Sequence, residues 1–119
     1  MNFKLILALV EDGRTDAVIH AAREAGATGV TVVSNARGEG VKPQKTFFGL
    51  SLETQRDLLL MVVEQGHARA VLEKIAVEAE FDTHSGAGIA VQLDVEDTVG
   101  VAHQIQALRD SHQADRPDD

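Results

Sequence analysis

The chain has 119 residues, of which 44% are hydrophobic and 25% are charged, a composition typical of one globular domain. Eleven lysine and arginine residues stand against 19 aspartate and glutamate residues, which gives a net charge of −8 with neutral histidine. An acidic surface of this kind repels phosphate backbones, so the sequence argues against a nucleic-acid partner. Cysteine is absent, which excludes disulfides, thiolate metal sites and cysteine nucleophiles.

The first apolar run, residues 3–10, is too short to cross a bilayer, and two acidic residues follow it where a signal peptide would carry small ones. We therefore expect a cytoplasmic protein without membrane insertion. Lys4 alone interrupts the run, which is typical of a strand buried on both faces. The run predicts a strand in the interior of a sheet.

Helical spacing of small and apolar residues predicts a helix over residues 12–25, with Asp12 or Thr15 as its N-cap and Gly26 as its stop. The same reasoning from apolar periodicity predicts three more strands and a second helix. These are strands at residues 29–34, 57–64 and 89–95 and a helix at residues 68–79.

The polar segment 41–55 predicts a long loop that carries a short β-ribbon, and loops of this length are usually functional. Residues 95–108 have the spacing of a short third helix. The last residues, 110–119, are polar and lack the apolar area needed to hold a structure, so they predict a disordered tail after a domain of residues 1–109.

The element order βαββαβ predicts the α+β class, as a ferredoxin-like sandwich in which two helices cover one face of a four-stranded antiparallel sheet. The strands are apolar on both faces, and the chain supplies no second covering layer. Burial against copies of the same chain is the natural solution, which predicts an oligomer.

Three motifs in this order resemble the PII nitrogen-regulatory signalling family. They are the segment Ala25-Gly26-Ala27-Thr28-Gly29-Val30-Thr31-Val32, the turn Gly38-Glu39-Gly40 before the long loop, and Gly86-Ala87-Gly88 leading into Leu93-Asp94-Val95. The resemblance spans residues 3–101 and implies a non-catalytic homotrimer. It also implies that ATP or ADP lies in the clefts between subunits and that the long loop docks on a transporter or an enzyme.

The resemblance also implies a ligand site. Thr31 matches a threonine that contacts adenine, and the turn at residues 38–40 matches the family's Gly-Phe-Gly turn under the nucleotide. The family's Gly-Asp-Gly-Lys loop matches residues 86–89. The expected ligand-binding residues are therefore Thr31, Arg37, Gly38, Glu39, Gly40, Lys42, Gly86, Ala87, Gly88 and Ile89.

The chain departs from the family where phosphates are neutralised. The family's lysine and two arginines fall on Ile89, Gly100 and Ala102. Each lost charge-assisted hydrogen bond costs about 1.5–3 kcal/mol, so we expect weaker ATP binding, or a less charged or differently placed ligand such as ADP or AMP, unless another cation substitutes. Lys42 replaces the glutamine that helps to hold 2-oxoglutarate, which puts that ligand in doubt.

The long loop is the predicted partner-binding segment. Its aromatic pair, Phe47 and Phe48, fits either a pocket of the target protein or the loop's own trimer. The family's nucleotidylated tyrosine cannot be present, because the chain contains no tyrosine. The residues expected to meet a partner are Lys45, Thr46, Phe47, Phe48 and Ser51.

Two alternatives remain open from the sequence. The first is a metal-binding or purely structural ferredoxin-like trimer that resembles the cation-tolerance proteins. Asp82 and His84 share a loop, and with carboxylates at a subunit junction they would bind a divalent metal. A small-substrate enzyme lacks a candidate base within a motif. The glycine turns are open to two interpretations as well, as anion-binding nests or as tight turns alone.

Overall fold

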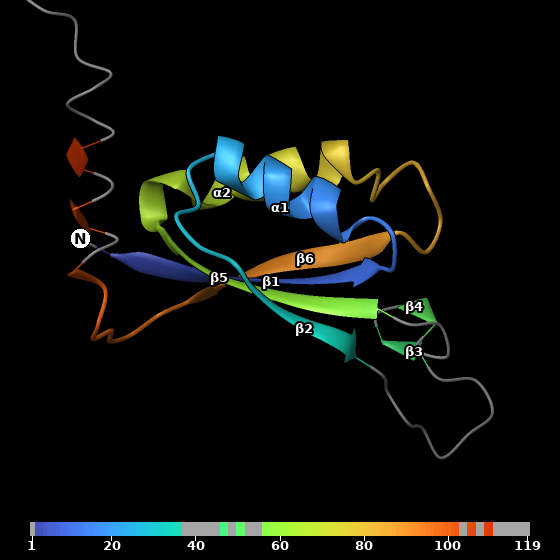
Figure 1. Cartoon of the computed structure of the whole chain (residues 1–119), viewed down its shortest axis with the longest axis horizontal. Coiled ribbons are helices and arrows are strands. Elements are labelled where there is room, and N and C mark those ends of the chain that lie inside the picture. The colour runs from blue at the N-terminus through green and yellow to red at the C-terminus, as the bar shows by residue number, and fades with distance from the viewer. Residues whose placement is uncertain are drawn as a thin grey trace, which may run out of the picture.

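The computed structural model describes residues 2–36, 46–47, 50–51, 56–102, 105–106 and 109–110. Both helices lie on the same side of the long strands (Figure 1). The strands are β1 (Phe3–Glu11), β2 (Thr31–Ala36), β3 (Thr46–Phe47), β4 (Leu50–Ser51), β5 (Arg56–Glu64) and β6 (Gly88–Asp94), and the helices are α1 (Thr15–Glu24) and α2 (Gln65–Glu78).

The four long strands form one antiparallel sheet in the order β2-β5-β1-β6. β1 and β5 pair along their whole length, from Phe3 opposite Glu64 to Glu11 opposite Arg56. Together with the two helices on one face, this order is that of a ferredoxin-like βαββαβ sandwich. The predicted fold class and the interior position of β1 are confirmed.

The core lies between the helices and one face of the sheet. Ile6 of β1 and Met61 of β5 are opposite each other in register and both are buried. Val18 from α1 and Val71 and Ile75 from α2 close over them. Burying large aliphatic side chains contributes about 1.5–3 kcal/mol each, which makes this layer the main source of stability.

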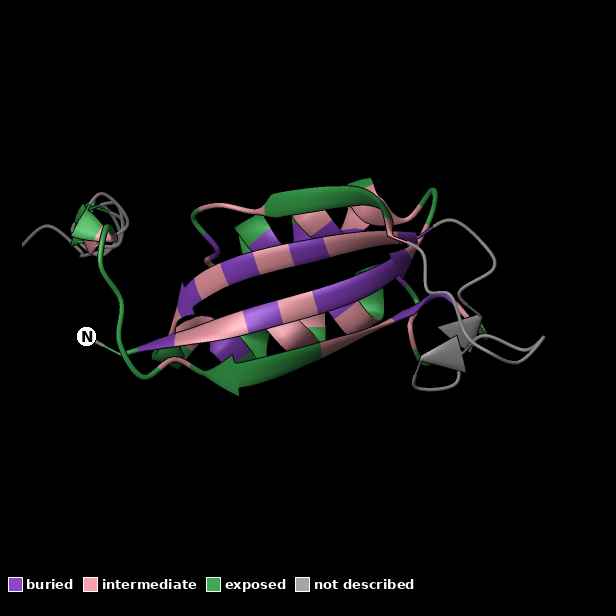
Figure 2. Cartoon of the chain, turned by 90° about the horizontal axis from the view of Figure 1, so that it is seen from below, coloured by how far each residue is buried: buried purple, intermediate pink, exposed green. Residues whose placement is uncertain are grey.

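The other face of the sheet, which we call the open face, is also aliphatic. Strand alternation puts Leu7, Leu60 and Val91 in one row across β5, β1 and β6. Figure 2 views this side and shows exposed edge strands beside central strands that alternate between buried and intermediate. Val91 is 38% exposed and Val33 is 46% exposed. The face also includes Leu5, Leu9, Leu58, Val62, Ile89 and Leu93.

The start of α1 differs from the prediction. Arg14 is the N-cap residue, and its side chain makes no capping hydrogen bond. The Thr15 hydroxyl instead donates to Asp57 Oδ2 at 2.6 Å, so the predicted cap by Asp12 or Thr15 is wrong. The predicted stop is confirmed, since Gly26 follows the helix with a φ of +118° that favours glycine.

The predicted β-ribbon within residues 41–55 is confirmed in part. β3 pairs with β4, with Thr46 opposite Ser51 and Phe47 opposite Leu50. In Figure 1 the two short strands lie at the end of the sheet where β2 ends and β5 begins. The rest of the predicted loop lies outside the described residues.

The predicted helix over residues 95–108 begins later than expected. Residues 95–101 are not helical, and the described helical residues are 102, 105–106 and 109–110. Gly100 has a φ of +82°, and Val99 is 96% exposed with nothing packed on it, so this stretch lacks the contacts that would support a helix. The predicted tail lies almost entirely outside the described residues. No helix in the described part of the chain is long and apolar enough to span a membrane.

Gly88, at the start of β6, is required by close packing. A Cβ atom there would lie 2.6 Å from the Leu9 carbonyl oxygen and 2.8 Å from Cε1 of Phe81. Gly29 offers a contrast, because a Cβ atom at that position meets nothing within 4 Å. The glycine at residue 88 therefore lets β6 and the Phe81 ring pack against β1.

We predict that Gly88→Ala lowers the free energy of unfolding by about 1–3 kcal/mol, because backbone atoms must move to admit the methyl group. Gly29→Ala is the matched control and should change stability by less than about 0.5 kcal/mol. Urea denaturation followed by circular dichroism measures both. Equal effects of the two substitutions would contradict this account of Gly88.

Candidate functional site

The two described parts of the predicted ligand site lie at opposite edges of the sheet. Thr31 begins β2, one edge strand, while residues 86–89 lead into β6, the other edge strand. Two strands separate these edges, so at about 4.8 Å per strand spacing they are roughly 14 Å apart or more. Within one chain they do not form one site.

The other predicted ligand residues lie outside the described part of the chain. These are Arg37, Gly38, Glu39, Gly40 and Lys42. Of the predicted partner-binding residues, Lys45 and Phe48 also lie outside it, and only the strand positions of Thr46, Phe47 and Ser51 are described.

The loop before β6 is held by its own backbone groups. The Ala87 N–H donates to the His84 carbonyl oxygen at 3.1 Å, and the Ala87 carbonyl oxygen accepts from the Glu11 N–H at 2.8 Å. Gly86 has a φ of +80°, which favours glycine. Because the Ala87 N–H is already bonded within the protein, it cannot contribute to an anion-binding nest in this conformation.

Arg56, which is absent from the predicted site, connects this loop to the rest of the sheet. Only 3% of the residue is exposed, and its Nη1 donates to the Gly86 carbonyl oxygen at 2.8 Å. Arg56 begins β5, while Gly86 precedes β6 beyond β1, so the side chain crosses the row occupied by Glu11. The sequence signal is a cation at the end of the long loop, immediately before an apolar strand.

Asp57, the next residue, makes contacts toward the helices. Its carboxylate accepts the Thr15 hydroxyl at 2.6 Å and the Asn35 N–H at 3.4 Å. Asn35 has a φ of +60° and lies in an irregularity of the β2–β5 pairing between Val33 and Ala36. Asp57 therefore joins the end of β2 to the start of α1.

Arg14 completes the polar end of the sheet. Its Nε donates to Glu11 Oε2 at 3.2 Å and its Nη1 to the Ala79 carbonyl oxygen at 3.1 Å. The same Nη1 lies 3.8 Å from Glu80 Oε1. Arg14 is thus engaged with the end of α2 and is not directed to a ligand.

The three positions where the family carries phosphate-binding cations are described and uncharged. Ile89 lies at the start of β6, half-buried, whereas Gly100 and Ala102 are exposed beyond that strand. None of the three therefore contributes a positive charge to a ligand.

The alternative metal site is not assembled among the described residues. Asp82 and His84 are exposed and belong to no group of three close ligand atoms. The described group that brings three such atoms within 4.8 Å consists of His20, Glu24 and Glu78. Lys74 lies 2.9 Å from Glu24 and 3.4 Å from Glu78, and its hydrogen bond holds the pKa of the Glu24 carboxyl below its usual range. The ammonium group of Lys74 thus already offsets one of the two carboxylate charges in this cluster.

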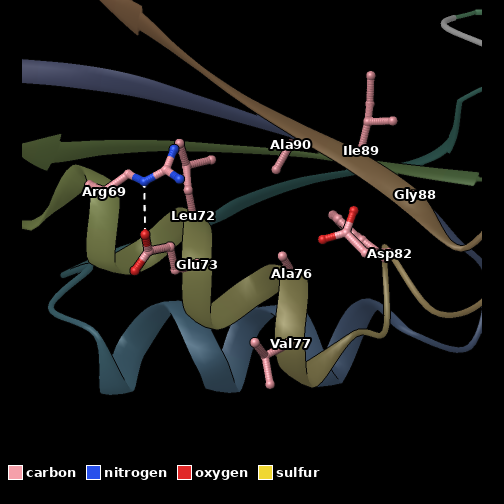
Figure 3. Close-up of a pocket in the computed structure, with 10 residues that line it drawn as sticks. Arg69, Leu72, Glu73, Ala76, Val77, Asp82, Gly88, Ile89 and Ala90 are labelled. Atoms are coloured by element: carbon pink, nitrogen blue, oxygen red, sulfur yellow. Dashed lines mark hydrogen bonds and ion pairs between the residues drawn. The ribbon is translucent and has the colours of Figure 1, made fainter.

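A groove of about 560 Å³ lies between α2 and β6, next to the loop before β6 (Figure 3). Among the described residues that line it, the one cation is Arg69, which is bonded to Glu73 at 2.9 Å, and Asp82 adds a carboxylate near Gly88. In Figure 3 Ala90 points toward α2, whereas Ile89 points away from the helix. The groove therefore offers apolar surface and paired charges, which suit a phosphate poorly.

Comparison with known proteins identifies the family. The model of the family "Nitrogen regulatory protein P-II" matches residues 3–104, most of the chain. The chain belongs to this family, as its sequence motifs predicted. No curated protein sequence matches the chain.

Two solved structures share the fold. One is CPII from Thiomonas intermedia bound to ADP, AMP and acetate, with a TM-score of 0.64 and 19% identity, covering 86% of this chain and 92% of that one. The other is described as a putative PII-like signalling protein from Thermus thermophilus, with a TM-score of 0.56 and 26% identity, covering 80% of this chain and 91% of that one. A PII-like signalling protein is the class that fold and family define.

The Thr15–Asp57 hydrogen bond gives a stability prediction for this end of the sheet. Thr15→Val keeps the side-chain shape but leaves Asp57 without its hydroxyl donor. It should lower the free energy of unfolding by about 1–2 kcal/mol. Thr28→Val, at an exposed position outside the helices and strands, is the control and should be neutral within about 0.5 kcal/mol. Urea denaturation measures both variants. If their midpoints coincide, the stabilising role of the Thr15–Asp57 hydrogen bond is wrong.

Proposed function

We propose that the protein is a non-catalytic, PII-like signal-transduction protein that binds an adenine nucleotide between subunits of a homotrimer and regulates a target protein through its long loop. The observation that carries the proposal is the separation of Thr31 from residues 86–89 at opposite edges of one sheet. A site that needs both must take one edge from each of two chains.

The geometry of the sheet favours a closed ring. A contact between the β2 edge of one chain and the β6 edge of the next is heterologous, and such contacts close into rings when the rotation allows. The open face supplies the driving force, because its row of aliphatic side chains would be removed from water at the centre of the ring. Three copies would then form three equivalent seams, each between the β2 edge of one chain and the β6 edge of the next.

The ligand follows from the charges at a seam. The solved CPII structure contains ADP and AMP, which supports an adenine nucleotide here. Ile89, Gly100 and Ala102 provide no cation, so only the basic residues Arg37 and Lys42 remain among those predicted to meet a phosphate. We therefore propose ADP or AMP in preference to ATP, with Thr31 at the adenine and the glycine turn at residues 38–40 under the nucleotide.

Ligand binding would act on the long loop by shifting its conformational populations, which requires unequal affinity of the nucleotide for the different loop states. The loop residues Lys45, Thr46, Phe47, Phe48 and Ser51 would then meet a transporter or an enzyme. We expect this regulation to take place in the cytoplasm.

The trimer is tested by charging the open face. Val91→Lys leaves a single chain intact, because Val91 is partly exposed there, but it puts an ammonium group into the proposed interface. Native mass spectrometry should show a trimer for the natural chain and mainly monomer for Val91→Lys. The control is Val77→Lys on α2, where valine is 76% exposed, and it should remain trimeric. A monomeric natural chain would contradict the proposal.

The ligand preference is tested by restoring one cation. Ile89→Lys returns a lysine to the position where the family carries one. Ile89 lies at the start of β6 beside the glycine loop, whereas Val91 lies further along the open face, so we expect the variant to stay trimeric. ATP affinity should rise about 10-fold, with a smaller gain for AMP. Calorimetric titration of the natural chain should show ADP or AMP binding more tightly than ATP. Val77→Lys adds the same charge elsewhere and should leave all three affinities unchanged. No heat with any nucleotide, in either protein, would contradict nucleotide sensing.

A further inference from the structure

The connection between β2 and β5 starts and ends beside one buried side chain. Ala36, the last described residue of β2, pairs with Arg56, and Arg56 is also the first residue after this connection. The residue therefore lies at both ends of the segment that contains the long loop. Both ends of that segment are therefore joined to the backbone of Arg56, one through strand pairing and one through the chain itself.

The same side chain holds the loop before β6. The guanidinium Nη1 donates to the Gly86 carbonyl oxygen at 2.8 Å, and a Cβ atom at Gly86 would lie 3.8 Å from Nη2. The Gly86 carbonyl belongs to the same peptide plane as the Ala87 N–H, which donates to His84. The guanidinium therefore fixes the orientation of a peptide unit within the glycine loop.

We propose that Arg56 is a positioning residue that couples the conformation of the long loop to that of the glycine loop at residues 86–88. The inference rests on the proposed function and gives it a physical path. A nucleotide that changes the conformation of the glycine loop would change the hydrogen bond between Arg56 and Gly86. The backbone position of Arg56, and with it the end of the long loop, would then change as well. The guanidinium is buried, so the bond is shielded from water and stronger than an exposed contact.

Arg56→Gln tests the coupling, since it removes the charge and the forked donor. Arg69→Gln is the matched control, because Arg69 is an exposed arginine on α2 bonded to Glu73. Cleavage of the long loop by a protease is measured with and without ADP as the probe. In the natural chain and in Arg69→Gln, ADP should change the cleavage rate. In Arg56→Gln this change should shrink about 10-fold while the protein stays trimeric.

A second measurement separates coupling from a merely structural role and needs no nucleotide. Residues 41–51 are replaced by a glycine-serine linker, alone and together with Arg56→Gln, and amide hydrogen exchange is followed at Ala87. The linker should change exchange at Ala87 severalfold in the natural background and leave it unchanged in Arg56→Gln. If the linker changes the exchange rate at Ala87 by the same factor in both backgrounds, the two sites are uncoupled and the proposal is wrong.

The outcomes distinguish the inference from the proposed function. If ADP binds and protects the loop equally in the natural chain and in Arg56→Gln, the coupling is overturned while the sensor function stands. If neither ADP nor AMP binds the natural chain, the sensor function fails, and the exchange measurement alone decides the coupling. Should Arg56→Gln not fold, Arg56→Lys replaces it, because lysine keeps the positive charge but lacks the planar, two-pronged N–H donors of the guanidinium group.

Discussion

The structure depends on one constraint: a four-stranded sheet has aliphatic side chains on both faces, and in the described part of the chain α1 and α2 cover one of them. Ile6 and Met61 lie under the helices, while Leu7 and Leu60, one position along each strand, face the other way. Because apolar area in contact with water is unfavourable, the second face favours the self-association that we propose. The proposed ligand site then exists only in the assembled protein.

Much of the fold could be predicted from sequence because strand and helix periods are local signals. The apolar run at residues 3–10 and the alternation at residues 89–95 indicated their strands to within one residue at each end. The third helix was placed too early, because the apolar spacing of Val101 and its neighbours gave no sign that Gly100 takes a positive φ. Helix capping by Thr15 was wrong because a distant residue, Asp57, binds the same hydroxyl.

The candidate site could be predicted from the sequence only in part. The motifs indicated the family, which the family model over residues 3–104 confirms, and they pointed to Thr31 and the glycine loop as ligand residues. Nothing local predicts that these motifs fall on opposite edges, since strand order is set by pairing across the whole sheet. The local sequence also does not show that Arg56 reaches over β1 to Gly86, because that contact joins residues 30 positions apart. Contacts of this range need the folded chain.

Shared edges also have a genetic consequence. In a ring of three, each seam takes its β2 edge from one subunit and its β6 edge from the next. One allele defective at Thr31 and another defective at Gly88 would each be inactive alone. A mixed ring of both products nevertheless contains one seam in which an intact β2 edge meets an intact β6 edge. Two such alleles would therefore complement each other in the same cell, whereas two defects on the same edge would not.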